Sequence, residues 1–152
     1  MYFGRINKDK TIENSRRVLE KYEYMHNIEL RELVSLQSPI MSDEPKAQNV
    51  NNSSEDKAIR FVQAKSYCST VRNAIEVIEN EVYRIILQDT YLVSNFQGNR
   101  SVMDHIASSG NRIEEAQFYR IKNEALICFA EVCPPVYIDN DMQKTFELLA
   151  FR

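Results

Sequence analysis

The side chains best suited to recognition chemistry lie in the segment from residue 117 to residue 123. Gln117, Arg120 and Asn123 recur every three positions, so a helix would carry them on one side. Gln, Arg and Asn are the side chains that bond base edges in the major groove, often through two hydrogen bonds at once. Tyr119 lies between them and could add a contact to a thymine methyl group or to a phosphate. The residue types therefore favour DNA reading as the chemistry of this segment.

Residues 101–130 are expected to position these side chains. Ser101 and Asp104 are typical of the start of a helix, and residues 108–111 interrupt the apolar pattern. Within that interruption, Gly110 is the residue best able to adopt the positive φ that ends a helix. A second helix follows, and its inward face is predicted to hold Phe118, Ile121, Lys122, Ala125, Cys128 and Phe129. A short helix, a turn with glycine and a longer helix are the order of a helix-turn-helix.

The charge of the chain limits how such a motif could bind DNA. With 19 Lys and Arg against 22 Asp and Glu, the formal net charge is −3, so sequence-independent attraction to phosphates should be weak. Arg112 in the turn and Arg100 in the preceding loop are the cations expected to hold the DNA backbone. Useful affinity would then require a second copy of the chain or another protein.

A family resemblance is carried by residues 118–130, FYRIKNEALICFA. This segment resembles the C-terminal signature of the ArpU family, small regulators of late genes, such as lysis and packaging genes, in phages and prophages of Gram-positive bacteria. That signature is similar to region 4 of bacterial sigma factors, a helix-turn-helix that also closes with an Ala-Leu pair, here Ala125-Leu126. The resemblance implies a DNA-binding transcription regulator, and it places Tyr119 and Arg120 at positions that face the groove.

The likeness covers the second half of the chain well and the N-terminal third only loosely. Shorter matching elements lie upstream, at Asn52–Asp56, Asn73–Ile75, Arg84–Leu87 and Tyr91. One departure concerns the start of the second helix, where region 4 usually carries basic residues and this chain has Glu114, Glu115 and Ala116. Acidic residues at that place weaken the expected attraction to phosphates.

Two other interpretations of the same residues stay open. Spacing alone does not encode helix-turn-helix geometry uniquely, so residues 101–130 could be an ordinary pair of packed helices. The segment could also belong to a helical interaction module that acts on RNA polymerase, or on another host or phage factor, without reading DNA. Glu114, Glu115 and the negative net charge favour that alternative.

The chain as a whole is predicted to be all-α. It has only three Gly and four Pro, and its apolar residues recur mostly at helical spacing. Residues 1–34 are expected to form an N-terminal helical arm, and residues 35–53 a linker. Residues 54–133 would form the helical DNA-binding domain, and residues 134–152 a C-terminal tail that could include one more helix.

The arm has two open roles. Its apolar residues, which run from Ile12 to Leu33, could pair with another subunit or pack back on their own domain. Because a lone motif with this charge should bind DNA weakly, we expect a homodimer. The arm is the first choice of interface, and the segment from Met142 to Phe151 is the second.

Few other chemistries are indicated. No phosphate-binding loop, nucleophile elbow or zinc-protease motif occurs, so neither an enzyme nor a cofactor is expected. Cys68, Cys128 and Cys133 form no C-x-x-C pair, and His26 and His105 do not lie at ligand spacing from them. No metal site is therefore expected.

The sequence also lacks the features that direct a chain to a membrane. No apolar run approaches the roughly 18 residues of a membrane-spanning helix. The first residues have no apolar segment of the kind found in secretion signals. We therefore expect a cytoplasmic protein without a membrane partner.

Overall fold

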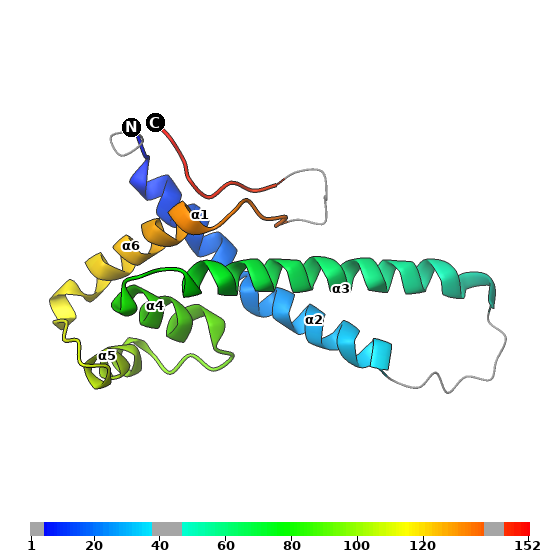
Figure 1. The fold of residues 1–152 in the computed structure, drawn as a ribbon, viewed down its shortest axis with the longest axis horizontal. Coiled ribbons are helices and arrows are strands. Elements are labelled where there is room, and N and C mark those ends of the chain that lie inside the picture. Colours follow the sequence, from blue (N-terminus) through cyan, green and yellow to red (C-terminus); the bar gives the residue numbers. More distant parts are fainter. Residues whose placement is uncertain (1–4, 38–46, 139–144) are drawn as a thin grey trace.

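The fold is built from helices. The computed structural model describes residues 5–37, 47–138 and 145–152, and it describes side chains in residues 5–35, 55–138 and 145–152. In chain order they are α1 (Lys8–Glu20), α2 (Tyr22–Gln37), α3 (Ala47–Glu76), α4 (Glu81–Leu87), the π-helical turn η1 (Gln88–Leu92), α5 (Asn99–Ser108) and α6 (Glu115–Val132). Figure 1 shows α3 as the long axis of the molecule, with α2 beside one half and α4, α5 and α6 gathered at the other end. The all-α expectation is confirmed for these residues, and within them no helix has the length and apolar character needed to cross a membrane.

α1 packs back on the chain instead of standing apart as an arm. Val18 is fully buried in an apolar cluster that α1 shares with α6. Ser15 Oγ donates to the carbonyl of Leu126 at 2.7 Å, and Asn14 Nδ2 donates to the carbonyl of Leu148 at 3.1 Å. The apolar face of α1, which the sequence left open to a second subunit, is therefore covered by the chain itself. The sequence could not decide this, because helical spacing predicts which face is buried but not what buries it.

The expected linker is too long at both ends. α2 continues to Gln37 and α3 begins at Ala47, so the first and last parts of the range 35–53 are helical. Residues 47–53 contain no Gly or Pro, and a polar composition alone does not stop a helix that extends from a packed segment. Residues 38–46 lie outside the described residues.

The larger apolar cluster joins α1, α3 and α6. Its buried members are Val18, Leu19, Tyr22, Tyr67, Cys68, Val71, Ala74, Ile75, Ile78, Leu87, Ala125, Leu126, Phe129, Ala130, Cys133, Val136, Ile138 and Leu148. Tyr67 OH donates to the carbonyl of Val18 at 2.5 Å, and burial is the main reason that the pKa of Tyr67 is raised. Because α6 contributes one whole side to this cluster, its position is fixed by the rest of the fold.

A smaller apolar cluster holds α4, α5 and α6 together. Its buried members are Ile85, Ile86, Val102, Ile106 and Phe118. Partly buried side chains complete it, among them Ile113 from the segment between α5 and α6 and Ile121 from α6. The residues expected to form a helix-turn-helix thus have an apolar core of their own, in which Phe118 is the largest side chain.

The C-terminal residues are extended rather than helical. Val136 and Phe146 form an antiparallel bridge, with N–H to carbonyl distances of 3.1 and 2.6 Å. The expectation of a short helix is wrong for residues 145–152, because their backbone groups are paired with other segments and so few residues do not nucleate a helix readily. Met142, which belongs to the same expected pattern, lies outside the described residues.

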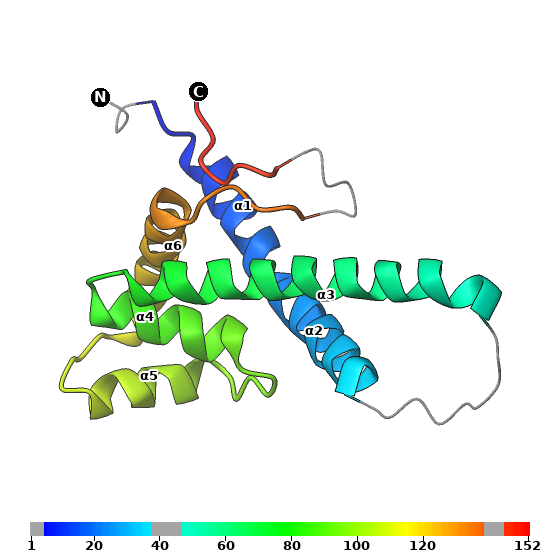
Figure 2. The same ribbon diagram turned by 45° about the vertical axis from the view of Figure 1, so that its right-hand side comes forward.

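The two ends of the described chain pair with each other. Ile6 forms an antiparallel bridge with Phe151, and the Arg152 N–H donates to the Arg5 carbonyl at 2.7 Å. Figure 2 shows these segments on the same side of the molecule, away from α5. These paired end segments lie against α1 and help to hold it in place, since Thr11 Oγ1 accepts from the Ala150 N–H at 3.1 Å.

Candidate nucleic-acid interface

The segment from α5 to α6 has the order helix, turn, helix that the sequence predicts. α5 begins at Asn99 with Gly98 at its N-cap, so Ser101 lies inside the first turn rather than at the cap. Gly98 has a φ of +96°, a conformation that favours glycine over residues with a Cβ. The capping role expected of Ser101 is therefore wrong, whereas the helix that follows is confirmed.

The turn between α5 and α6 occupies residues 109–114, which is longer than the roughly three to four residues of a compact helix-turn-helix. Gly110 has the expected positive φ, +91°. The carbonyl of Ile106 accepts from Ser109 Oγ at 2.6 Å and from the Asn111 N–H at 3.3 Å. These bonds satisfy the free carbonyl groups at the end of α5 and give the turn a defined path to α6.

α6 has one side packed in the fold and one side in solvent. Phe118, Ala125 and Phe129 are buried, and the rest of the predicted inward face, which is Ile121, Lys122 and Cys128, is partly buried. That prediction is confirmed. All six candidate DNA-contacting residues are exposed: Arg100, Arg112, Gln117, Tyr119, Arg120 and Asn123.

A hydrogen bond joins the start of α5 to the exposed side of α6. Asn99 Nδ2 donates to Tyr119 OH at 3.3 Å, and the Tyr119 ring meets the buried Phe118 ring edge-on with centroids 5.7 Å apart. Tyr119 is therefore held at its ring and its hydroxyl although 64% of its surface is exposed. The first turn of α5, which carries Arg100, lies next to the exposed side of α6 as a result.

Two of the candidate arginines have acidic neighbours on their own helices. Arg100 Nε lies 3.9 Å from Asp104 Oδ1, and Arg120 Nε lies 4.0 Å from Glu124 Oε1. Both pairs are long and largely exposed, and such pairs contribute roughly 0–1 kcal/mol. Either guanidinium can therefore turn toward a phosphate or a base at little energetic cost.

Lys122 is not part of this surface. Its Nζ lies 5.6 Å from the centre of the Tyr91 ring, on the inner side of α6. Burial, followed by the nearby positive charge of Arg16, lowers the pKa of Lys122. Arg100, Arg112 and Arg120 are the basic residues of the motif that remain exposed among the described residues of α5, the turn and α6.

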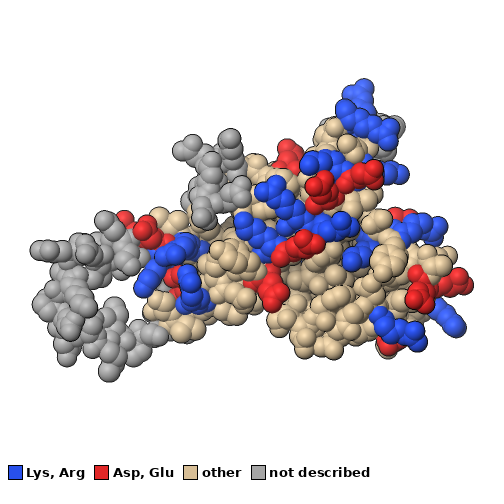
Figure 3. Space-filling view, turned by 180° about the vertical axis from the view of Figure 1, so that it is seen from behind, with Lys and Arg blue, Asp and Glu red and all other residues tan. Residues whose placement is uncertain are grey.

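The beginning of α6 is acidic and exposed. Glu114 is at the N-cap, Glu115 is in the first turn, and both side chains face solvent together with Ala116. Negative charge at a helix N-terminus is favourable for the helix itself. Figure 3 shows acidic side chains interspersed with basic ones on the face seen from behind, so this face does not carry one continuous positive surface.

Polar contacts that sequence reasoning missed fix α5 and α6 to the helices beneath them. His105 Nδ1 and Asp89 Oδ2 are 2.6 Å apart and join α5 to η1. Tyr83 OH donates to Glu124 Oε2 at 3.0 Å, and burial, followed by this carboxylate, raises the pKa of Tyr83. The partners are 16 and 41 positions apart in the chain, so no local pattern identifies them.

The structure also brings together residues for which no shared site is predicted. His26, Glu29 and Cys68 offer ligand atoms that all lie within 4.8 Å of one another. His26 does not lie at ligand spacing from a cysteine in the sequence, but α2 and α3 pack side by side and bring it near Cys68, which linear spacing does not reveal. A His and a Glu three positions apart on a helix were the available signal, since that spacing is used in helical metal sites.

Comparison with known proteins finds a regulatory relative. The chain is 29% identical over 118 residues to a protein of Enterococcus hirae named "Putative autolysin regulatory protein ArpU". The match covers 78% of this chain and 82% of that protein. No family model matches the chain, and no solved structure matches it. The similarity supports the resemblance to the ArpU family and a regulatory role.

Proposed function

We propose that this chain is a sequence-specific DNA-binding transcription regulator whose recognition helix is α6. The observation that carries the proposal is the exposure of Gln117, Arg120 and Asn123 along the side of α6 opposite its buried face. Side chains of these types can each make two hydrogen bonds to a base edge in the major groove. The buried face holds α6 firmly in the fold, as precise reading of bases requires.

The remaining candidate residues would position the motif on the duplex. Arg100 and Arg112 would contact phosphates on either side of α6, and Tyr119 would contact a thymine methyl group or a further phosphate. The motif would then act as region 4 of a sigma factor does, in keeping with the resemblance of residues 118–130. Its targets would be late phage genes, such as lysis and packaging genes, in the cytoplasm of the bacterial host. No catalytic activity is part of the proposal.

A binding titration with matched arginine variants tests this proposal. The full chain is mixed with labelled fragments that cover the promoter regions of the phage or prophage that encodes it, at moderate salt. We expect preference for particular fragments, weaker binding by Arg120→Ala, and unchanged binding by Arg60→Ala, whose side chain is exposed on α3. A folded sample without preference for any fragment contradicts the proposal, and so does equal weakening by both substitutions.

We further propose that the chain acts as a homodimer, because a single motif in a chain with a net charge of −3 makes few phosphate contacts. The apolar face of α1 is covered, so the contact between copies must lie elsewhere. Ile59 and Val62 lie one turn apart on α3, and 49% and 62% of their surfaces are exposed. Light scattering at tens of micromolar should give a dimer mass for the full chain and a monomer mass for Val62→Asp. A monomer mass for the unaltered chain contradicts this proposal.

A second candidate function is a protein–protein interaction module that acts on RNA polymerase or another host or phage factor. The exposed acidic start of α6, with Glu114 and Glu115, favours it, because negative charge there opposes approach to phosphates. Replacing both residues by Gln separates the two candidates. DNA affinity should rise if α6 enters the groove, whereas capture of polymerase from a host lysate should fall if the acidic residues bind protein.

A further inference from the structure

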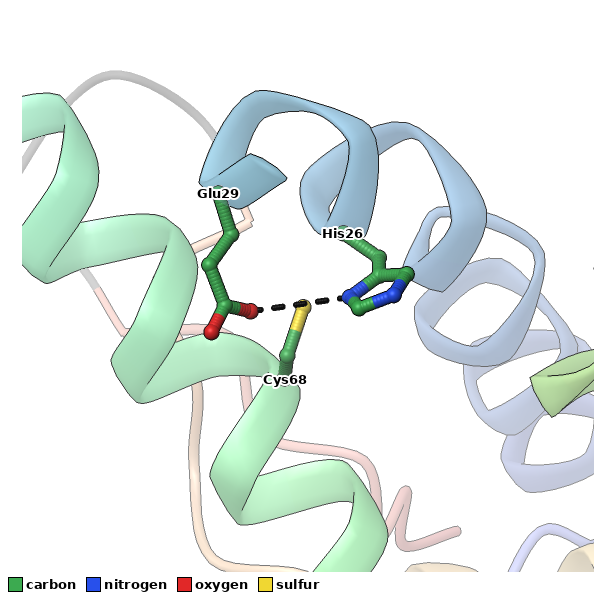
Figure 4. A group of neighbouring side chains, drawn as sticks. All are labelled: His26, Glu29 and Cys68. Carbon is green, nitrogen blue, oxygen red and sulfur yellow. Dashed lines mark ion pairs between the residues drawn. The ribbon is translucent and has the colours of Figure 1, made fainter. Parts of the chain in front are cut away.

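Three side chains with different metal-binding atoms meet between α2 and α3. Figure 4 shows His26 and Glu29 on α2 pointing toward Cys68 on α3. One ligand atom of each residue lies within 4.8 Å of the other two. An imidazole nitrogen, a carboxylate oxygen and a thiolate sulfur are the donors that zinc takes in proteins.

Hydrogen bonds satisfy this cluster only in part: Cys68 and Glu29 interact as hydrogen-bond partners, but two other polar atoms of the cluster have none. His26 Nδ1 and Glu29 Oε2 are 3.6 Å apart, which is too far for a hydrogen bond of normal length. Both atoms are buried and have no hydrogen-bond partner. Folded proteins rarely leave two such atoms facing each other unless an ion or a water molecule completes them.

We propose that His26, Glu29 and Cys68 bind one divalent cation of the zinc class and that the ion ties α2 to α3. Zinc–ligand bonds of roughly 2.0–2.3 Å place the ligand atoms of a tetrahedral site roughly 3.3–3.8 Å apart. The atoms seen within 4.8 Å must therefore close in by about 1 Å. Rotation about side-chain bonds can supply this, since both α2 ligands are only partly buried.

The fourth position of such a site would be left to a water molecule, because the three residues supply one ligand atom each. The side chain of His26 is 38% exposed and that of Glu29 is 16% exposed, whereas Cys68 is fully buried. The imidazole ring is held in place by stacking on the Tyr22 ring, with centroids 5.6 Å apart. A water molecule can therefore complete the coordination while the three protein ligands approach from the inner side.

Metal binding at Cys68 exchanges one proton for the ion. The S–H bond breaks, a sulfur–metal bond forms, and the proton leaves to solvent. Burial, followed by the charge of Glu29, raises the pKa of Cys68 to about 12, so the thiol is protonated at neutral pH without metal. Arg72 interacts with both Glu29 and Cys68 and opposes a cation, but the thiolate formed on binding offsets this positive charge.

The donor set also limits which ions fit. A thiolate and an imidazole favour zinc and other late transition metals, whereas magnesium and calcium require oxygen ligands. Cys133 is a matched control, because it is also a buried thiol with a pKa raised to about 12 by burial, and it is not one of the clustered residues.

Titration of the full chain with Co²⁺, followed by displacement with Zn²⁺, tests the proposal. After removal of metal with a chelator, we expect one equivalent of Co²⁺ to give a thiolate-to-cobalt absorption band and the strong visible bands of a tetrahedral site. Cys68→Ala should abolish the thiolate band, and His26→Gln should weaken binding at least about 10-fold. Cys133→Ala should retain both the band and the affinity.

Circular dichroism of each variant keeps these results interpretable. Cys68 is part of the core, so its substitution can disturb folding, but His26 is partly exposed and His26→Gln leaves the apolar cluster intact. Zn²⁺ should raise the melting temperature of the unaltered chain and not that of His26→Gln. The proposal is overturned if the folded chain gives no thiolate–cobalt band, if His26→Gln binds as tightly as the unaltered chain, or if Mg²⁺ binds equally well.

Discussion

The two halves of α3 are surrounded by opposite arrangements of side chains. Near α4, α5 and α6, the large ring of Phe118 is inside and polar Gln117 is outside, as in a self-contained globule. Along α2, the aliphatic side chains of Leu30 and Val62 are 45% and 62% exposed, while Glu32 is only 2% exposed. The second region has apolar groups outside and a carboxyl group inside.

Among the described residues, buried polar atoms without a hydrogen-bond partner are concentrated on α2, although Thr90 Oγ1 in η1 is one as well. Glu32 Oε2 is buried without a hydrogen-bond partner, like the ring nitrogen of His26 and the carboxylate of Glu29 nearby on α2. Exposed aliphatic side chains and unpartnered polar atoms are both costly unless something else binds. The α4–α6 end therefore has an apolar core of its own, whereas the α2–α3 pair has the features of a region completed by a cation or by a second copy.

The largest expected effect compares one large apolar side chain from each region. Phe129 is fully buried, so Phe129→Ala should lower the free energy of unfolding by about 3–5 kcal/mol. Leu30 is 45% exposed, so Leu30→Ala should change it by no more than about 0.5 kcal/mol. Urea unfolding followed by circular dichroism measures both. Equal losses would mean that the outer face of α2 is packed as tightly as α6.

Alkaline pH should destabilise the fold through two buried thiols of the larger apolar cluster, Cys68 and Cys133. Burial raises the pKa of Cys68 and of Cys133 from 9.0 to about 12. A raised pKa stabilises the fold fully below the unfolded-state pKa, and this stabilisation is lost as the pH rises through the folded-state value. The free energy of unfolding should therefore fall as the pH rises from 9 toward 12.

Urea unfolding at a series of alkaline pH values, with Cys133→Ala beside the unaltered chain, divides this effect between the two thiols. The variant should keep the share due to Cys68 and lose the share due to Cys133. If the free energy of unfolding of Cys133→Ala depends on pH as it does in the unaltered chain, burial does not oppose ionisation of the Cys133 thiol.

A smaller expected effect concerns Arg120 on α6, whose substitution should change DNA affinity much more than the free energy of unfolding. Arg120→Ala should weaken specific DNA binding by about 1–3 kcal/mol, the range for one lost base contact. Its free energy of unfolding should change by no more than about 0.5 kcal/mol, because the Arg120 to Glu124 pair is exposed and 4.0 Å long. Fluorescence anisotropy and urea unfolding on the same samples test this, and a stability loss as large as that of Phe129→Ala would contradict it.

The smallest effect concerns the phosphate contact assigned to Arg100. Arg100→Ala should weaken binding to all DNA sequences alike and reduce the slope of log affinity against log salt by about 0.9. Folding should be unchanged, since the pair with Asp104 is exposed and 3.9 Å long. Titrations at several salt concentrations, with specific and unrelated DNA, measure this slope. A loss confined to one DNA sequence would assign Arg100 to base reading instead.

Helical spacing is sufficient to predict the local part of this fold. Phe118, Ala125 and Phe129 recur at intervals that place them on one side of a helix, and all three are buried. Gly110 is predicted to end α5 because few other residues adopt positive φ, and its φ is +91°. The exposure of the four candidate DNA-contacting residues on α6, which are Gln117, Tyr119, Arg120 and Asn123, follows from the same periodicity.

Contacts between distant segments are what the sequence leaves unspecified. Ser15 appears as a polar residue in an arm, yet its hydroxyl bonds α6 across 111 positions. Phe146 fits a helical pattern, yet its backbone pairs with Val136 in an extended bridge. The juxtaposition of His26 with Cys68 depends on how α2 lies against α3, which side-chain spacing within either helix does not determine.

α1 is synthesised well before the residues that its polar side chains bond. Asn14 bonds the carbonyl of Leu148 across 134 positions, and Thr11 bonds the Ala150 N–H across 139. A ribosome that adds about 5–20 residues per second needs on the order of ten seconds to cover that distance. Until then only water can satisfy these side chains. α1 therefore docks late, and a nascent chain that stops before Leu148 leaves the inner face of α1 incompletely covered.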